Sequence, residues 1–185
     1  SDWIHQRGGL MIVVITDLTT LGLLEAPGKL GADIVTGEAQ ACGNPVNFGG
    51  PYVGFLATRK DYIRQIPGRM SGMADTVDEK RAFTLVLQTR EQHIRRERAT
   101  SNVCTNQGLN ALTVAIWLSL LGKQGIQELA NICLQRAHYC ADKIRQIQGF
   151  SLYTCQPFFH EFVVQYEGSV SELLTFMKTR NCLPG

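Results

Sequence analysis

The sequence predicts an α/β fold with a small second module near its carboxyl end. Strand-like apolar segments occupy the first part of the chain, and "LMIVVITDL" (Leu10–Leu18) is the clearest of them. Between Ile126 and Ile144, apolar residues recur at steps of three and four, which is typical of a helix. From Phe150 onward the pattern changes to strand, strand and helix. The 185 residues, 44% hydrophobic and 18% charged, are enough for a globular domain with a core.

Four segments in the first half are predicted strands. The run Leu10–Thr16 is continuously apolar, which is typical of a strand covered on both faces, as in a parallel sheet. "ADIVTG" and Tyr52–Arg59 are the second and third strands, and "KDYIRQI" predicts a short helix after them. Proline and glycine recur early in the span 67–81, so we expect a loop there. Ala82–Thr89 is apolar again and predicts the fourth strand.

The second half is predicted to be mainly helical. "CTNQGLNALTVAIWLSLLG" is mostly apolar and predicts a buried helix. The next helix carries one apolar stripe and ends at Gly149. The stripe consists of Ile126, Leu129, Ala130, Cys133, Ala137, Cys140, Ala141 and Ile144. After two strands around Pro157, Ser169 and Glu172 have the spacing of a capping box ahead of the final helix, "LLTFMKTRN".

The charge balance and the cysteines argue against several classes of protein. A net charge of +2 is too small to indicate nucleic-acid binding by itself. No apolar run approaches the about 20 residues of a membrane span. The six cysteines form no CxxC pair and do not cluster with the four histidines, so we expect no metal site. Their scatter is typical of reduced thiols in a cytosolic compartment, and the helical spacing of Cys133 and Cys140 favours buried packing.

Three places could hold a ligand. Asp17 ends the first strand and could pair with a cationic ring nitrogen of a cofactor, although we favour a cap or turn before "LTT". The glycines of "FGGPYVG" permit close backbone approach but are a weak indication. Thr100, Ser101 and Asn102 precede a predicted helix, so their side chains and free N–H groups could hold a phosphate. The same residues could instead cap the helix, and residue types do not decide between the two roles.

Arginines concentrate between Arg90 and Arg98. The segment "REQHIRRER" could form a binding strip for nucleic acid or protein. No aromatic residue is interleaved for base stacking, and two glutamates dilute the positive charge, so we favour a solvated or interface segment. Arg69, in "PGRMSG", could clamp a carboxylate, but one loop arginine is weak evidence.

Long motifs resemble those of a known family. "FGGPYVGFLATRKDYIRQIPGRMSG" and "LQTREQHIRRERATSNVCTNQ" resemble the glycine cleavage system P-protein, glycine dehydrogenase (decarboxylating), and "GADIVTGEAQACGNPVNFGG" fits the same family. Within the family, the match is to subunit 1, the amino-terminal half of the fused form. The likeness is close from Leu10 to Gly149 and looser to Gly185, where "PFFHEFVV" still agrees.

The resemblance implies a fold, an activity and partners. The fold would be that of fold-type-I pyridoxal-phosphate enzymes, the aspartate-aminotransferase-like class. Residues 1–149 would be the last part of the large domain, and residues 150–185 the beginning of the small one. The family decarboxylates glycine and passes the aminomethyl group to the lipoyl H-protein. A lysine of subunit 2 holds the pyridoxal phosphate, so this chain would carry no catalytic residue. Its location would be the bacterial cytoplasm, or the mitochondrion in a eukaryote.

The resemblance also gives a meaning to the loop after "GADIVTGE". In the catalytic half of the family, a similar "GAD" strand leads into a His-Lys pair that carries the cofactor. Aligned from Gly31, Gln40 and Ala41 of this chain stand at the positions of that pair. Without an amine, the loop cannot bind the cofactor covalently. The nearest lysines are Lys29 and Lys60.

A supporting role for the chain follows from the same resemblance. Thr100, Ser101 and Asn102 would reach toward the cofactor phosphate of the partner subunit, because related dimeric enzymes use this loop across the interface. Subunit 1 of the family is much longer than 185 residues, so we expect a piece of a longer protein, inactive alone. Two other functions stay open: a stand-alone pyridoxal-phosphate enzyme that uses Lys29 or Lys60, and a binding module built on Arg90–Arg98.

Overall fold

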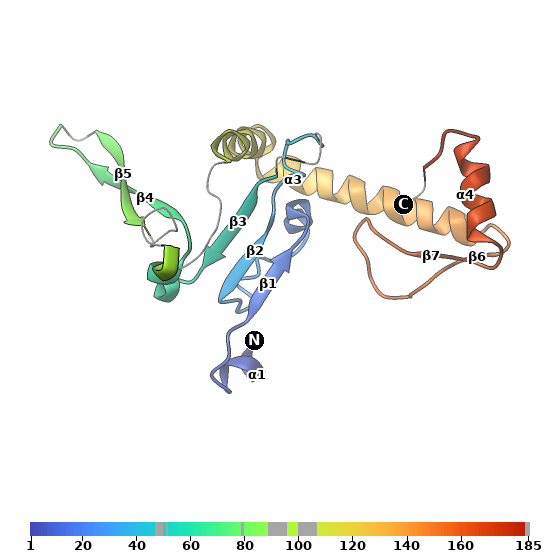
Figure 1. Cartoon of the computed structure of the whole chain (residues 1–185), viewed down its shortest axis with the longest axis horizontal. Helices are drawn as coiled ribbons and strands as arrows, with labels where there is room; N and C mark the ends of the chain where they lie inside the picture. The colour runs from blue at the N-terminus through green and yellow to red at the C-terminus, as the bar shows by residue number, and fades with distance from the viewer. Residues whose placement is uncertain (47–49, 51, 79, 89–95, 100–106, 184–185) are drawn as a thin grey trace. The chain divides into compact units, whose positions relative to one another are not determined.

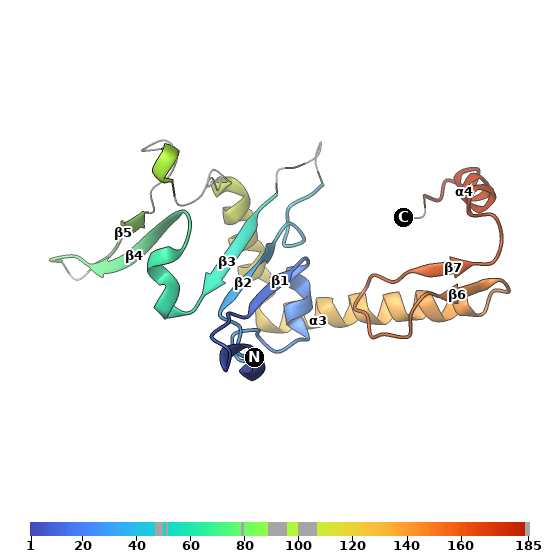
Figure 2. The same ribbon diagram turned by 60° about the horizontal axis from the view of Figure 1, so that its bottom comes forward.

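The computed structural model describes residues 1–46, 50, 52–78, 80–88, 96–99 and 107–183 (Figures 1 and 2). These residues form two compact units, 1–122 and 123–185. The first unit contains strands β1 to β5 and three 3-10 helices, and the second contains strands β6 and β7 and helix α4. The long helix α3 contributes to both units. The domain boundary that we expect at residue 150 concerns the complete protein and stays a prediction.

The bounds of the elements agree with most of the predicted segments. In the first unit they are α1 Asp2–His5, β1 Ile12–Ile15, η1 Leu18–Gly22, β2 Ile34–Glu38, β3 Gly54–Thr58, η2 Lys60–Gln65, β4 Arg69–Asp75, β5 Arg81–Gln88 and η3 Arg96–Arg98. They continue with α3 Gly108–Arg145, β6 Phe150–Leu152, β7 Val164–Tyr166 and α4 Val170–Lys178.

A three-stranded sheet with the order β1-β2-β3 positions the candidate site. β1 pairs in parallel with β2, with Ile15 opposite Gly37, and β2 pairs antiparallel with β3. The predicted first three strands are therefore confirmed. The prediction that the first strand is covered on both faces is wrong for this chain, because Ile12 and Val14 of β1 are 59% and 66% exposed. In the described part of the chain, no layer packs on the face of the sheet that carries them.

The buried carboxylate of Asp33 links the segments next to the three strands of this sheet. Asp33, with a side chain only 2% exposed, accepts hydrogen bonds from the Met11 backbone N–H at 2.8 Å and from Arg59 Nη1 at 3.0 Å. Its other contact is His5 Nε2 at 2.7 Å. The Met11 N–H and the hydrogen bond to His5 lower the pKa of Asp33 to about 2. One side chain thus links α1 to the segments that flank all three strands.

The prediction of a loop over 67–81 is wrong, because β4 occupies residues Arg69–Asp75 and pairs with β5 as an antiparallel hairpin. Gly72 has a packing role in this strand. A Cβ at Gly72 would lie 2.6 Å from Val86 Cγ1, so the Val86 side chain fills the space that a residue with a side chain would need. The glycine that predicts a loop is therefore part of the sheet.

Helix α3 is interrupted at Gly122, whose φ of 59° and ψ of −172° are not helical. The predicted burial of its first part is wrong for this chain. Leu109, Leu112, Ile116 and Leu120 are between 52% and 80% exposed, because no described segment covers that face. The uninterrupted apolar runs of the sequence do not indicate a membrane span, yet among the described residues α3 is long and apolar enough to cross a membrane by length and composition alone.

The second unit confirms the predicted helix, strands and cap. Along α3, Ala130 and Ala141 of the predicted stripe are buried. Cys140, which we expected to be buried, is exposed. Gly149 follows the helix with a φ of +83°, which glycine adopts without strain. The side chain of Ser169 accepts a hydrogen bond from the Glu172 N–H and caps α4.

Candidate functional site

The candidate site lies at the carboxyl ends of β1 and β2. Because the two strands are parallel, their carboxyl ends meet at one edge of the sheet, where α/β proteins bind ligands. Asp17 follows β1, and the loop Ala39–Asn44 follows β2. Burial raises the pKa of the Cys42 thiol, and the negative charge of Asp17 raises it further, so the two segments lie close enough to interact electrostatically.

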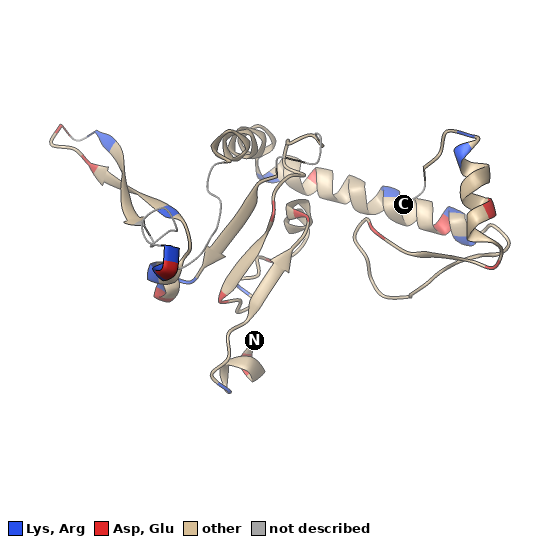
Figure 3. Cartoon of the chain, in the orientation of Figure 1, with Lys and Arg blue, Asp and Glu red and all other residues tan. Residues whose placement is uncertain are grey.

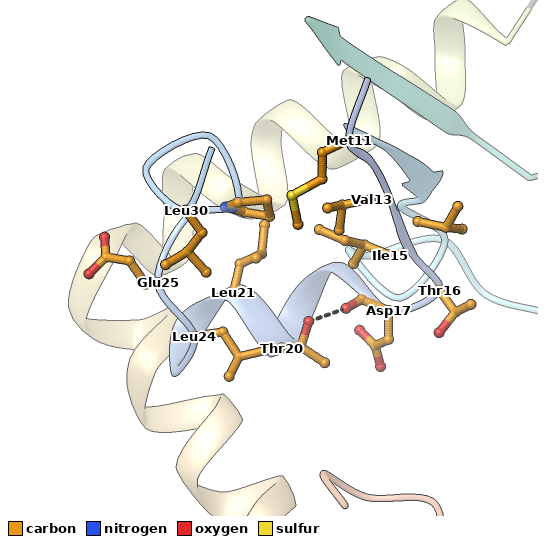
Figure 4. A pocket seen from close by; sticks show the side chains of 12 residues that line it. Met11, Val13, Ile15, Thr16, Asp17, Thr20, Leu21, Leu24, Glu25 and Leu30 are labelled. Atoms are coloured by element: carbon orange, nitrogen blue, oxygen red, sulfur yellow. Dashed lines mark hydrogen bonds between the residues drawn. The ribbon is translucent and has the colours of Figure 1, made fainter. Parts of the chain in front are cut away.

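Asp17 serves as a helix cap. Its Oδ1 accepts hydrogen bonds from the Thr19 N–H at 2.8 Å and from Thr19 Oγ1 at 2.7 Å. Its backbone carbonyl accepts a hydrogen bond from Thr20 Oγ1 at 2.8 Å (Figure 4). The geometry therefore agrees with the cap that we favoured over pairing with a cofactor ring.

Backbone hydrogen bonds fix the loop after β2. Glu38 Oε1 accepts hydrogen bonds from the N–H groups of Gln40 at 3.1 Å and Val53 at 2.9 Å. The Asn44 N–H donates to the Gln40 carbonyl at 3.1 Å. Gly43 has a φ of +88°, and a Cβ there would lie 2.9 Å from Trp117 Cδ1. Glycine is thus required where the loop packs on α3, and Glu38, the last residue of β2, holds the loop backbone by accepting its hydrogen bonds.

Two amide side chains in this loop have buried nitrogens. Gln40 Nε2 and Asn44 Nδ2 are both inaccessible to solvent and without a hydrogen-bond partner. Buried amide donors are normally paired, so these two are incomplete in the part of the protein that the structure describes. The residue types had not suggested this pair. The signal available in the sequence was the spacing of two amides by four residues in a tight loop.

The loop contains no effective nucleophile. Ala41 is exposed, and Cys42 is buried, with 1% of its surface accessible. Burial, and secondarily the charge of Asp17, raise the pKa of the Cys42 thiol to about 11. A thiol with so high a pKa stays protonated at neutral pH and is a poor nucleophile.

Both nearby lysines lie at the opposite edge of the sheet. Lys29 precedes β2, and Lys60 follows β3, whose Thr58 pairs with Ile34 at the start of β2. Four residue steps along β2 separate that edge from the loop, a distance on the order of 13 Å at about 3.3 Å per step. Lys29 Nζ also contacts Glu25 Oε1 at 2.9 Å. Neither lysine is placed to substitute for an amine in the loop.

A cavity of about 450 Å³ lies beside β1 (Figure 4). Most of its lining is apolar and comes from Met11, from β1 and from the segment after β1, including Val13, Leu21 and Leu24. Two acids, Asp17 and Glu25, also line it, while the described lining contains no lysine, arginine or histidine. A phosphate group would find no positive charge here. The observed residues therefore do not fit pyridoxal phosphate, covalently in the loop or through its phosphate in this cavity.

Several predicted site residues lie outside the described residues. Thr100, Ser101 and Asn102 are among them, so their phosphate role stays a prediction. Of the segment Arg90–Arg98, the structure describes only the last three residues, as the exposed 3-10 helix η3. Arg69, predicted in a loop, begins β4. Searching the described residues alone, we find no group of three histidine, cysteine or acidic side chains that could hold a metal ion.

Comparison with known proteins decides the family. The family model described as "Glycine cleavage system P-protein" matches residues 1–182. The chain belongs to the glycine cleavage system P-protein family. A P-protein relative from Prosthecochloris aestuarii, named "Probable glycine dehydrogenase (decarboxylating) subunit 1", is 51% identical over 177 residues, 96% of this chain and 40% of that protein. A relative of the same name from Desulfitobacterium hafniense is 53% identical over 165 residues, 89% of this chain and 37% of that protein.

A solved P-protein structure shares the fold. The crystal structure of glycine decarboxylase (P-protein) of the glycine cleavage system, in inhibitor-bound form, matches with a TM-score of 0.86 and 40% identity, over 96% of this chain and 40% of that chain. Both are mixed α/β structures. The P-protein chain described here spans about 40% of the length of these relatives. The family resemblance predicted from the sequence motifs is thus confirmed.

Proposed function

We propose that this chain is part of the subunit of glycine decarboxylase that lacks the cofactor lysine, and that this subunit supports the active site of its partner. Glycine decarboxylase removes the carboxyl group of glycine and transfers the aminomethyl group to the lipoyl H-protein. When bound, pyridoxal phosphate supplies the electron sink for that decarboxylation. We assign the cofactor to subunit 2.

The loop Ala39–Asn44 is the observation that carries this proposal. Gln40 and Ala41 stand where the resemblance places the His-Lys pair, and the loop offers no amine. Its backbone is nevertheless held by Glu38 and packed on Trp117. A loop that keeps a fixed shape without a reactive group fits a structural role beside another site better than catalysis in this chain.

The finer features of the fold belong to the same proposal. A parallel β1-β2 pair followed by an antiparallel β3 supports a fold-type-I pyridoxal-phosphate enzyme, with 1–149 from the large domain and 150–185 from the small one. Thr100, Ser101 and Asn102 would then reach the cofactor phosphate of subunit 2. The chain alone would be inactive. The complex would work in the bacterial cytoplasm or, in a eukaryote, in the mitochondrion.

Glycine–bicarbonate exchange tests the supporting role. The full-length subunit 1 that contains this chain, subunit 2 and the lipoyl H-protein are purified separately, and exchange of labelled bicarbonate into glycine is measured. We expect activity only when both subunits are present. Full exchange by subunit 2 and H-protein without subunit 1 would refute the proposal.

Borohydride reduction followed by peptide mapping tests the competing function of a stand-alone enzyme. Full-length subunit 1 is incubated with pyridoxal phosphate, reduced and digested, with subunit 2 as the positive control. We expect the pyridoxyl group on a subunit 2 peptide and on neither Lys29 nor Lys60. Stoichiometric labelling of either lysine would instead favour independent catalysis by this chain.

A further inference from the structure

Within the described residues, the hairpin of β4 and β5 packs extensively only on itself. Among the described elements, each of these two strands makes its main contacts with the other. An isolated two-stranded hairpin is at best marginally stable in water, and additional packing is normally required. The hairpin therefore needs a surface that the described residues do not provide.

The two faces of the hairpin differ. Met73 lies opposite Phe83, and Ser71 lies opposite Leu85, so these four side chains share one face. Met73, Phe83 and Leu85 are 62%, 73% and 54% exposed, and we call these three residues the hairpin apolar face. Val86 lies on the other face, because its side chain occupies the space over Gly72.

The hairpin apolar face can be removed from water without burying a charge. Among the described residues of the hairpin, the charged ones lie at its open end, at Arg69, and at its turn, at Asp75, Asp78, Lys80 and Arg81, and the middle of both strands is uncharged (Figure 3). An aromatic side chain carries roughly 150–250 Å² of surface, so Phe83 alone leaves on the order of 100 Å² of apolar surface in water. A stable interface buries about 800 Å² per partner, so the hairpin would supply one part of a larger contact.

The partner subunit is the occupant that best fits this face. The relatives are named subunit 1, which implies a second subunit, and this argument rests on the proposed function. β5 ends at Gln88, and the chain continues toward Thr100, for which we propose a contact with the partner's cofactor. A hairpin joined to such a segment is close in sequence to the expected subunit interface. Uncharged apolar surface with an aromatic residue at its centre is typical of an interface core.

We propose that the β4–β5 hairpin is an assembly arm of subunit 1, whose Met73, Phe83 and Leu85 dock on an apolar surface of subunit 2. The hairpin is ordered fully only when the two subunits associate. In this proposal the role of the hairpin is assembly.

Matched threonine substitutions on full-length subunit 1 test the proposal. Phe83→Thr and Leu85→Thr remove apolar surface from the docking face and introduce a β-branched residue, which strands favour. Val86→Thr is the control, because Val86 is 53% exposed, almost the same as Leu85, but lies on the other face. We expect the double variant F83T/L85T to bind subunit 2 at least about tenfold more weakly, and V86T to bind within about twofold of the unchanged protein.

The melting temperature of subunit 1 alone separates docking on the partner from packing within one chain. We expect the double variant F83T/L85T to have the same melting temperature as unchanged subunit 1 when each is measured alone. A clear fall in that temperature without a change in affinity would show that subunit 1 itself covers the face, and would overturn the proposal. Equal weakening by V86T would also overturn it, because the effect would not belong to one face.

Amide hydrogen exchange provides a measurement without a substitution. We expect β4 and β5 of the unchanged subunit 1 to gain at least about tenfold protection when subunit 2 is added. Protection that does not change would overturn the docking proposal. If protection does not change but glycine–bicarbonate exchange still requires subunit 1, the docking proposal is wrong and the proposed function is retained. If subunit 2 alone is fully active, the supporting role fails as well.

Discussion

Replacing Gly37 by alanine should separate two strands on which the candidate site depends. Gly37 lies opposite Ile15 in the parallel β1-β2 pair. A Cβ at Gly37 would press directly on the Ile15 carbonyl oxygen and would also lie 2.9 Å from Phe55 Cε1. The carbonyl belongs to the backbone and cannot rotate away without breaking the strand pairing. The new methyl group therefore has to push β1 away from β2.

The expected loss of stability follows from these contacts. Forcing a methyl group into packed structure costs about 1–3 kcal/mol, and more when backbone has to move. Replacement of glycine by alanine also stiffens the unfolded chain, which returns roughly 0.4–1 kcal/mol. Because the clash at Gly37 involves backbone, we expect the upper part of the range, a net loss of about 2–3 kcal/mol in the free energy of unfolding.

Gly54→Ala is the matched control in the neighbouring strand. Its Cβ would lie 3.6 Å from the Gly37 carbonyl oxygen, which is an ordinary contact. We expect a change of no more than about 1 kcal/mol, in either direction. Urea unfolding followed by circular dichroism measures both variants. If Gly37→Ala and Gly54→Ala unfold with the same free energy, the close approach of β1 and β2 is not what requires glycine.

Three further perturbations test individual side chains. Asp33 has a folded pKa of about 2, below its usual value of 3.8, so it stabilises the protein above pH 3.8. That contribution is lost as the pH falls toward 2, and Asp33→Asn should flatten acid unfolding curves over this interval. Cys42, with a pKa raised from 9.0 to about 11, should react with iodoacetamide at pH 8 at least about a hundredfold more slowly than the exposed Cys140, as measured by mass spectrometry. Denaturation should abolish the difference. Ser169→Ala removes the cap on the Glu172 N–H, a long hydrogen bond of 3.4 Å, and should lower the free energy of unfolding by about 0.5–1 kcal/mol in urea titrations.

Local patterns in the sequence predicted the central sheet well. The apolar run around Val13 predicts β1, because burial in a sheet demands such residues whatever their partner. Strand pairing depends on residues far apart in the sequence. The segment Tyr52–Arg59 therefore predicts a strand but not its antiparallel direction. β4 was missed because Pro67, Gly68 and Gly72 resemble a loop, whereas Gly72 makes room for Val86 of the facing strand. A residue required by a neighbour distant in sequence gives no local signal.

Burial was harder to predict than secondary structure. The helical pattern of α3 was correct, but Leu112 and Ile116 are exposed because burial depends on a second layer. Cys140 occupies its predicted place in the stripe, yet it is exposed for the same reason. Periodicity identifies the face of a helix that can be buried, and only tertiary structure decides whether anything covers it.

The candidate site was predictable in its chemistry and less so in its geometry. The missing amine at Ala41 could be stated from the motif alone. The contacts that hold the loop, from Glu38 to the Val53 N–H and between Gly43 and Trp117, join positions far apart in sequence. The Asp33 cluster has the same origin. Asp33, His5 and Arg59 are residue types that are common on protein surfaces, and only folding brings them together.

The two-stranded hairpin has a consequence for how the cell should produce this protein. Within the described residues, no third strand pairs with β4 or β5, so the outer edge of each strand is open to pairing by another strand, next to exposed Phe83. Unprotected edges of this kind recruit other chains and start aggregation. Copies of subunit 1 made in excess of subunit 2 would be the vulnerable ones. Balanced synthesis of the two subunits, for example from one transcript, would keep each hairpin exposed only briefly.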